Sequence, residues 1–260
     1  LPWKHKIKLT IMKKIKEQNM FDIIPDSYTI QFVLNYLTPL LLNTKEEAKY
    51  FLSIVGDNML KKNTDKIHIL NNICKDFIVL LEENVFHYFK NLYHSNTTFK
   101  YNWHEHDYKK CRIINFNKSV KNSGYWRSFI KYHILDILSV AVHYSKRYGN
   151  SDEYLKTKIE SHPDLNNIFY LSNNNIDDII TKFVKSHITI VEGSNISMTW
   201  KEIYYIWKQF LRENNLPHII FSKNLKTKLE ALITYNDEKQ IFLNVTSMHL
   251  SFIKNLSRFG

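Results

Sequence analysis

The sequence predicts a mainly helical protein, with a helical domain over residues 1–192 and a smaller C-terminal module over residues 193–260. Three observations predict this division. Apolar residues recur at helical spacing along most of the chain, and only five Gly and five Pro interrupt its 260 residues. The Glu192-Gly193-Ser194-Asn195 turn is the clearest candidate break between domains. A hydrophobic content of 44% is enough for an ordinary buried core.

The N-terminal part is expected to begin with two or three helices. Ile7, Ile11 and Ile15 lie at helical spacing among lysines, which predicts an amphipathic basic helix before the break at Pro25. Residues 28–42 predict a mostly buried helix. Thr44-Lys45-Glu46-Glu47 combines an N-cap residue with early acids, which predicts the start of a helix that runs to about residue 60.

The rest of the larger domain is predicted to alternate a little strand with more helix. Residues 66–70 predict a short strand. Helices are expected over residues 74–93, 125–148 and 177–186, with Gly149 ending the second and Ser151-Asp152-Glu153 capping another. Gly56-Asp57-Asn58 is either a kink or a carboxylate site for a metal, and a lone Asp favours a structural role.

A short β-containing segment is expected near residues 97–117, as an irregular strand or hairpin that is aromatic and basic. Tyr101, Trp103 and Tyr108 alternate with cations there, so stacking on bases and contact with phosphates could combine. The candidate nucleic-acid-binding residues of this segment are Trp103, Lys109, Lys110 and Arg112.

The same segment admits a second interpretation, as a metal site. His104, His106 and Asp107 could hold zinc or a harder divalent ion, with Glu105 as a base and His133 or His143 as a further ligand. The pattern is weak, because only a strand places both histidines on one face and no His-Glu-x-x-His spacing accompanies them.

The C-terminal module predicts two helices followed by a hairpin. Residues 198–214 carry an apolar stripe that includes Trp200, Trp207 and Phe210. Ser222 is expected to cap a second helix, with Leu225, Leu229 and Leu232 inward and Lys223, Lys226, Thr227 and Lys228 outward. Residues 234–243 then predict two short strands around a polar turn that contains Lys239.

These roughly 65 residues resemble the winged-helix module of the primase-helicases of poxviruses and other large DNA viruses. The resemblance lies in residues 202–211, in Ser222-x-x-Leu225-x-x-x-Leu229 and in the hairpin. It implies a winged-helix-like module that contacts DNA, with Lys223, Lys226, Lys228 and Lys239 as binding residues. The Walker-type ATPase of that family is missing, so no catalytic residue is carried over.

The wider sequence is similar to uncharacterised proteins of giant viruses. Gly56-Asp57-Asn58, residues 104–108 and His143-Tyr144-Ser145 carry this similarity, together with 27 Asn. Leu1 in place of Met suggests that the chain belongs to a longer polypeptide. If the protein is viral, we expect it in the host cytoplasm or a viral factory.

Net charge favours a polyanionic partner. The formal charge is +11, and three stretches, residues 2–20, 100–148 and 194–260, are basic by 5, 7 and 4 while the remainder is acidic. We therefore expect nucleic acid as the partner. The resemblance implies a non-catalytic nucleic-acid-binding region of a viral replication or transcription protein, with DNA a better partner than RNA. A scaffold that contacts other replication or virion proteins and a metal-dependent nuclease remain the alternatives.

Other classes are disfavoured by absent signals. No nucleotide-binding loop, nucleophile elbow or dinucleotide fingerprint is present, so we expect neither a catalytic centre nor a cofactor. Cys74 and Cys111 stand in unrelated contexts, which indicates a reducing, intracellular compartment. No apolar run approaches the roughly 18 residues of a membrane span, so no membrane is expected as a partner.

Overall fold

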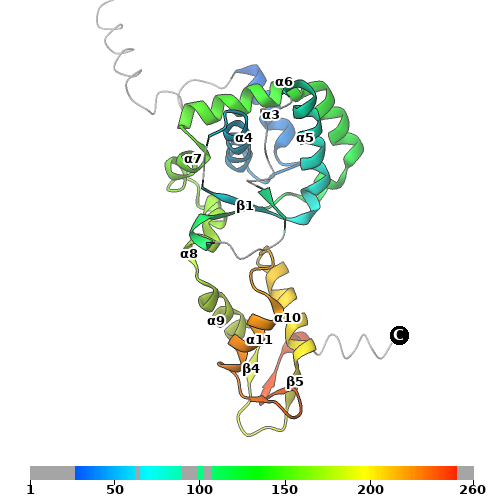
Figure 1. Cartoon of the computed structure of the whole chain (residues 1–260), viewed down its shortest axis with the longest axis vertical. Helices are drawn as coiled ribbons and strands as arrows, with labels where there is room; N and C mark the ends of the chain where they lie inside the picture. Colours follow the sequence, from blue (N-terminus) through cyan, green and yellow to red (C-terminus); the bar gives the residue numbers. More distant parts are fainter. Residues whose placement is uncertain (1–26, 63–64, 90–98, 102–106, 251–260) are drawn as a thin grey trace, which may run out of the picture.

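A computed structural model describes residues 27–62, 65–89, 99–101 and 107–250, which form two lobes along the long axis of the molecule (Figure 1). The upper lobe holds most of the helices around a small parallel sheet, and the lower lobe combines three helices with short antiparallel strands. The expected mainly helical fold is confirmed. The basic helix predicted around residues 7–15 lies outside the described residues.

The upper lobe consists of the described residues between positions 28 and 173. Its helices are α3 (Tyr28–Leu37), α4 (Lys45–Met59), α5 (Lys75–Phe89), α6 (Ser123–Tyr148), α7 (Ser151–Lys158) and α8 (Tyr170–Asn173). Among its described residues, the 3₁₀ turns are η1 (Asn72–Cys74), η4 (Tyr108–Lys110), η5 (Lys118–Lys121) and η6 (Pro163–Phe169). The strands are β1 (Ile67–Leu70), β2 (Phe99–Lys100) and β3 (Cys111–Ile114).

Helix boundaries in this lobe follow the local signals in the sequence. The Thr44 hydroxyl accepts from the Glu47 amide, and the Glu47 carboxylate accepts from the Thr44 amide, so the predicted start of α4 is confirmed as a capping box. Gly149 ends α6 at φ 84°, which is also as predicted. The cap of α7 is Asn150 rather than Ser151, because the Asn150 side chain accepts from the Glu153 amide.

The three strands form a parallel sheet in the order β2-β1-β3. For the segment near residues 97–117 the hairpin alternative is wrong in the described part, because β2 and β3 each pair with β1 and not with each other. Side chains alternate across the sheet. Leu70 and Ile114 join the core of the upper lobe, whereas Ile69 and Ile113 join the core that continues into the lower lobe.

Gly56 and Asp57 have structural roles where α4 crosses α6. A Cβ atom on Gly56 would lie 2.1 Å from the Ala141 carbonyl oxygen, so only glycine permits this approach. The buried Asp57 carboxylate accepts from the Ser145 hydroxyl at 2.5 Å and from the Ser151 amide at 2.7 Å. It therefore joins α4, α6 and α7, and Gly56-Asp57-Asn58 is not a kink but part of α4.

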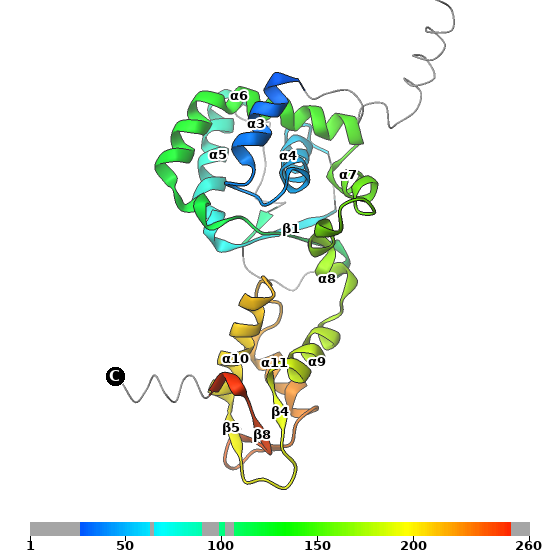
Figure 2. The ribbon, with the colours of Figure 1, turned by 180° about the vertical axis from the view of Figure 1, so that it is seen from behind.

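The lower lobe contains the predicted two helices and hairpin. Its elements are α9 (Ile176–His187), β4 (Thr189–Ile190), β5 (Ser197–Thr199), α10 (Trp200–Glu213), α11 (Ser222–Glu230), β6 (Tyr235–Asn236), β7 (Ile241–Leu243) and β8 (Val245–Thr246). Strands β6 and β7 pair antiparallel as expected, and β5 extends them to a sheet in the order β5-β7-β6. Strand β4 pairs with β8 (Figure 2).

Three details of this lobe differ from the predictions. Ser222 is the first residue of α11 and provides no side-chain cap, since Phe221 occupies the N-cap position. Leu232 lies beyond α11 with half of its surface exposed, and Ile233 fills the core instead. Helix α9, which precedes the boundary predicted at residues 192–193, shares the core of the lower lobe, because it packs on α10 with Phe183 edge-on to Trp207 at 5.1 Å.

The two cysteines are buried as free thiols. Burial raises the pKa of Cys74 to about 12 and that of Cys111 to about 11, so both stay protonated near neutral pH. None of the described helices combines the length and the apolar content needed to cross a bilayer.

Candidate nucleic-acid interface

A cleft of about 440 Å³ lies between the two lobes. Its upper wall comes from the ends of β1 and β3 and from η5, and its lower wall from the C-terminal half of α10 and the loop that follows it. The volume falls in the range of ligand sites in proteins, roughly 300–1,000 Å³. Because both lobes line it, the cleft exists only where the two parts of the chain meet.

The charged residues that line the cleft are positive. Lys208 and Arg212 stand one turn apart on α10, so both project to the same side of the helix. Lys118 faces them from η5, and His218 follows in the loop. Among the described residues, no Asp or Glu lines this cleft. Cations gathered in a concave site focus the potential and attract an anion.

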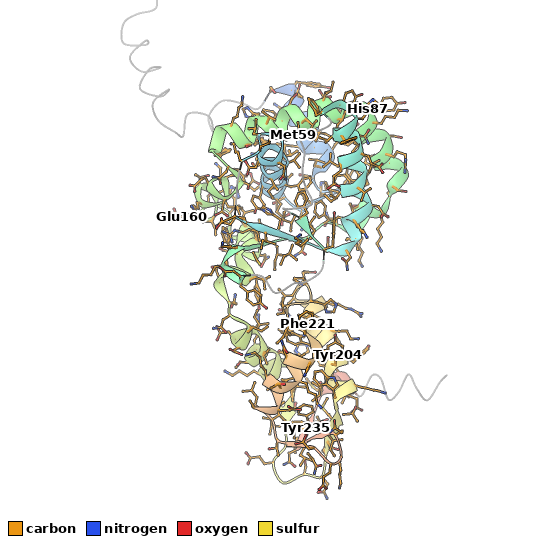
Figure 3. All side chains as sticks on the ribbon, in the orientation of Figure 1. Met59, His87, Glu160, Tyr204, Phe221 and Tyr235 are labelled. Atoms are coloured by element: carbon orange, nitrogen blue, oxygen red, sulfur yellow. The ribbon has the colours of Figure 1, made fainter. Side chains whose placement is uncertain are left out.

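Little in the described part of the chain neutralises these cations. Arg212 and Lys118 are exposed. The Lys208 ammonium lies 4.8 Å from the centre of the Tyr204 ring, a cation–π contact that keeps its charge (Figure 3 labels Tyr204). Each side chain is therefore able to contact a phosphate.

Amide and apolar side chains complete the walls. Asn71, Asn72, Asn115 and Asn215 line the cleft. The Asn71 amide is engaged, because its Nδ2 donates to the Phe116 carbonyl at 2.9 Å and its Oδ1 accepts from the Phe116 amide. The apolar wall is formed by Ile73, Tyr101, Leu211 and Pro217. Burial raises the pKa of Tyr101, which keeps its hydroxyl neutral. Amides and a ring beside cations match the chemistry of a nucleotide.

A second hollow, of about 310 Å³, adjoins the cleft and shares Asn115, Asn215 and Leu216 with it. Lys182 of α9 and Glu213 of α10 line this hollow. The Glu213 carboxylate accepts from Gln209 at 2.9 Å and contacts His187 Nε2 at 3.0 Å. Hydrogen bonds from Gln209 and then His187 lower the pKa of Glu213, which favours its negatively charged form. The positive surface of the cleft therefore ends at this second hollow.

The aromatic, basic segment predicted as the main binding surface is only partly available. Arg112 was wrongly assigned to phosphate contact, because it is buried and bonded to Asp152. Tyr108 donates a hydrogen bond from its hydroxyl to the Ile219 carbonyl and so links the lobes. Lys110 lies 3.5 Å from the Asp65 carboxylate, while Lys109 is exposed. Trp103 lies outside the described residues.

The candidate metal ligands do not form a site within the described residues. His104 and His106 lie outside them. The Asp107 carboxylate accepts from the Lys109 amide at 3.0 Å and caps η4. Across the described ranges, His, Cys, Asp and Glu form no group of three suited to a metal ion.

The lysines predicted on α11 and in the hairpin divide into two kinds. Lys226 lies 4.6 Å from the centre of the Tyr235 ring and 3.6 Å from the Glu230 carboxylate (Figure 3 labels Tyr235). Lys228 forms an ion pair with Asp177 at 2.5 Å. Lys223 and Lys239 are exposed, and their ammonium groups form no ion pair with the described residues. Two of the four predicted contacts are thus already engaged within the protein.

Comparison with known proteins adds no relative: the chain matches no family model, no curated protein and no solved structure. The candidate interface therefore rests on its own geometry. Lys118, Lys208 and Arg212 were not singled out from the sequence. Only the i, i+4 spacing of the last two on an amphipathic helix hinted at a shared basic face.

Proposed function

We propose that this protein binds nucleic acid in the interlobe cleft and catalyses no reaction itself. The observation that carries the proposal is the convergence of Lys118, Lys208 and Arg212 on one cleft that no carboxylate of the described residues lines. A phosphate backbone satisfies all three cations at once and releases its own counterions, which drives binding. DNA is the better candidate than RNA on the sequence resemblance, which also motivates a role in viral replication or transcription.

The lower lobe is proposed to be a winged-helix-like module with a second contact surface. Support comes from the order of α10, α11 and the β6–β7 hairpin, from the third helix α9, and from β5, which extends the hairpin to three strands. One departure is the connection over residues 214–221, which exceeds the three or four residues of a simple helix-turn-helix. On this proposal Lys223 and Lys239 contact phosphates at this second surface.

The test is fluorescence anisotropy of labelled single-stranded DNA, duplex DNA and RNA over a salt series. A Lys118→Ala/Lys208→Ala/Arg212→Ala variant is compared with Lys45→Ala/Lys146→Ala/Lys201→Ala, which removes equal charge at exposed positions outside the cleft. Each lost phosphate contact should reduce the log–log salt slope by about 0.7–0.9, so the cleft variant should lose about 2 to 3.

The control variant should bind much more tightly than the cleft variant, even though both carry the same net charge. Equal affinities of the two variants would contradict a site in the cleft. Weak binding that is indifferent to salt, in both variants and in the wild type, would favour the scaffold alternative, in which the basic faces meet acidic proteins.

A further inference from the structure

We infer that the exposed face of α3 and the first half of α6 is a stacking platform for single-stranded nucleic acid, continuous with the interlobe cleft. This inference rests on the proposed function and adds the class of ligand. It is carried by three observations: a ladder of aromatic rings at the surface, cations beside the ladder, and η5, which joins the platform to the cleft.

The ladder spans two helices. Tyr36 of α3 stacks on Phe129 of α6, with ring centres 4.6 Å apart and planes at 14°. Tyr125 lies nearly parallel to the same Phe129 ring, at 6.5 Å and 6°. Phe32 and Tyr28 continue the row along α3, with centres 4.7 Å from Tyr36 to Phe32 and 6.4 Å from Phe32 to Tyr28. The packing holds the inner rings in place and pre-orients the outer ones.

The outer rings are open to solvent. Tyr28 is 83% exposed and Tyr132 is 75% exposed, while Tyr36 and Tyr125 are each more than a third exposed. Tyr125 and Tyr132 stand seven residues apart on α6, two helical turns, so they project from the same face before the helix bends at His133. Large rings grouped on one surface are more often a contact surface than isolated ones are.

The charge beside the ladder selects the partner. Lys121 and Lys131 are exposed, Lys121 at the end of η5 just before Tyr125 and Lys131 on α6. Lys131 lies 5.9 Å from the centre of the Tyr132 ring. The first half of α6 contains no acid, and Asp136, one turn further on, contacts His133 at 3.2 Å. Exposed rings interleaved with cations are complementary to unpaired bases joined by phosphates.

Turn η5 makes the platform continuous with the cleft. Lys118 at its start lines the cleft, whereas Ser119 and Asn122 line a hollow of about 120 Å³ together with Leu40, Tyr125 and Trp126. The turn is held against the upper lobe, because the Ser119 hydroxyl donates to the Leu40 carbonyl and Trp126 Nε1 donates to the Ser119 carbonyl at 3.1 Å. A strand leaving the cleft at Lys118 therefore meets Lys121 and then the Tyr125 ring.

Such a surface should prefer single strands to duplexes, because base pairing hides the faces of the bases. Ring stacking requires an exposed base face, which a duplex offers only at its ends. The platform should therefore bind single strands longer than the cleft can hold, and affinity should rise with length until cleft and platform are both filled. Duplex DNA should gain little from the tyrosines.

The experiment measures the affinity of the whole chain for oligothymidylates of 5 and 20 nucleotides and for a 20-base-pair duplex. Tyr125→Ala/Tyr132→Ala is compared with Tyr88→Ala/Tyr205→Ala, which removes two exposed tyrosines from α5 and α10. We expect the platform variant to bind the 20-mer about five- to 150-fold more weakly for each stacked base lost, with duplex affinity unchanged. Tyr125→Phe/Tyr132→Phe keeps both rings and should bind like the wild type.

The outcomes separate this inference from the proposed function. If the cleft variant loses binding but the platform variant binds the 20-mer as the control does, the platform is wrong and the cleft stands. If neither variant differs from its control, both fail. The single variant Tyr132→Ala serves as a check on folding, because its ring is three-quarters exposed and its loss should not disturb the core. It should still bind the 20-mer more weakly than the wild type. A change from dimer to monomer in its sedimentation velocity would instead identify the face as a contact between two copies, and would overturn the inference.

Discussion

Arg112 and Asp152 form a buried ion pair in which two guanidinium nitrogens each donate to one carboxylate oxygen, at 2.8 and 3.2 Å. Arg112 Nη1 also donates to the carbonyls of Lys109 and Cys111, and the guanidinium lies 4.5 Å from the centre of the Phe169 ring. The pair thereby ties β3 to α7 and η6. Planar, two-point pairing suits arginine better than lysine.

Removing one partner of this pair should destabilise the protein strongly. Asp152→Ala leaves the Arg112 charge buried without a counter-ion, and we expect the free energy of unfolding to fall by about 3–5 kcal/mol. Urea unfolding at pH 7 measures it. Glu153→Ala is the matched control, because Glu153 is exposed in its ion pair with Lys156 and should cost about 1 kcal/mol or less. If both variants lose a similar free energy of unfolding, the buried pair stabilises the protein no more than an exposed one.

The close crossing of α4 and α6 predicts a marked asymmetry between two glycines. Gly56→Ala places a methyl group 2.1 Å from the Ala141 carbonyl oxygen, and the forced separation should cost about 1–3 kcal/mol. Gly124→Ala, in the first turn of α6, has no atom within 4 Å of the added carbon and should stabilise by up to about 1 kcal/mol. Thermal unfolding of both variants tests this prediction. If Gly56→Ala unfolds at the same temperature as the wild type, α4 and α6 do not approach as closely at this position as the structure shows.

Buried His68 predicts a loss of stability in acid. Neither ring nitrogen has a hydrogen-bond partner among the described residues. Burial, and then the Arg112 charge, lower the pKa of His68 to about 3, against the opposing effect of Asp152. Between the unfolded pKa near 6.5 and about 3, the unfolded chain binds the proton and the folded chain does not. Stability from this group is therefore present above pH 6.5 and is lost as the pH falls.

The size of that effect can be isolated with a phenylalanine. From pH 7 to pH 5 the histidine should contribute a loss of about 2 kcal/mol, which His68→Phe should abolish while keeping an aromatic ring beside Tyr50 and Phe99. Urea unfolding of both proteins at the two pH values gives the difference. If the wild type and the variant lose the same stability, protonation of His68 does not limit the fold.

The lysines of the lower lobe should differ in their effect on DNA binding. Lys223→Ala/Lys239→Ala removes two exposed ammonium groups that form no ion pair with the described residues, and should lower the log–log salt slope by about 1.4–1.8. Lys226→Ala/Lys228→Ala removes cations already paired with Glu230 and Asp177, so it should change binding less. Anisotropy with duplex DNA compares the two double variants. If Lys226→Ala/Lys228→Ala weakens binding more than Lys223→Ala/Lys239→Ala, the second contact surface proposed on the lower lobe is wrong.

Local signals predicted the helices well. The capping residues Thr44 and Gly149 set their helix ends through bonds and dihedral angles within a few residues, so neighbouring sequence was sufficient. The β6–β7 hairpin is local in the same sense. The parallel pairing of β1 with β2 and β3 was missed, because partners separated by helices leave no short-range pattern.

The sequence by itself determined the mainly helical class, the positions of most helices and the excess of positive charge, since each depends on residue type and on spacing along one element. Tertiary structure alone decided which cations remain available. Arg112 became a buried partner of Asp152, whereas Lys118, Lys208 and Arg212 were brought to one cleft from distant segments. The physical reason is that burial and electrostatic potential depend on distances through space, and those distances exist only after the two lobes have packed.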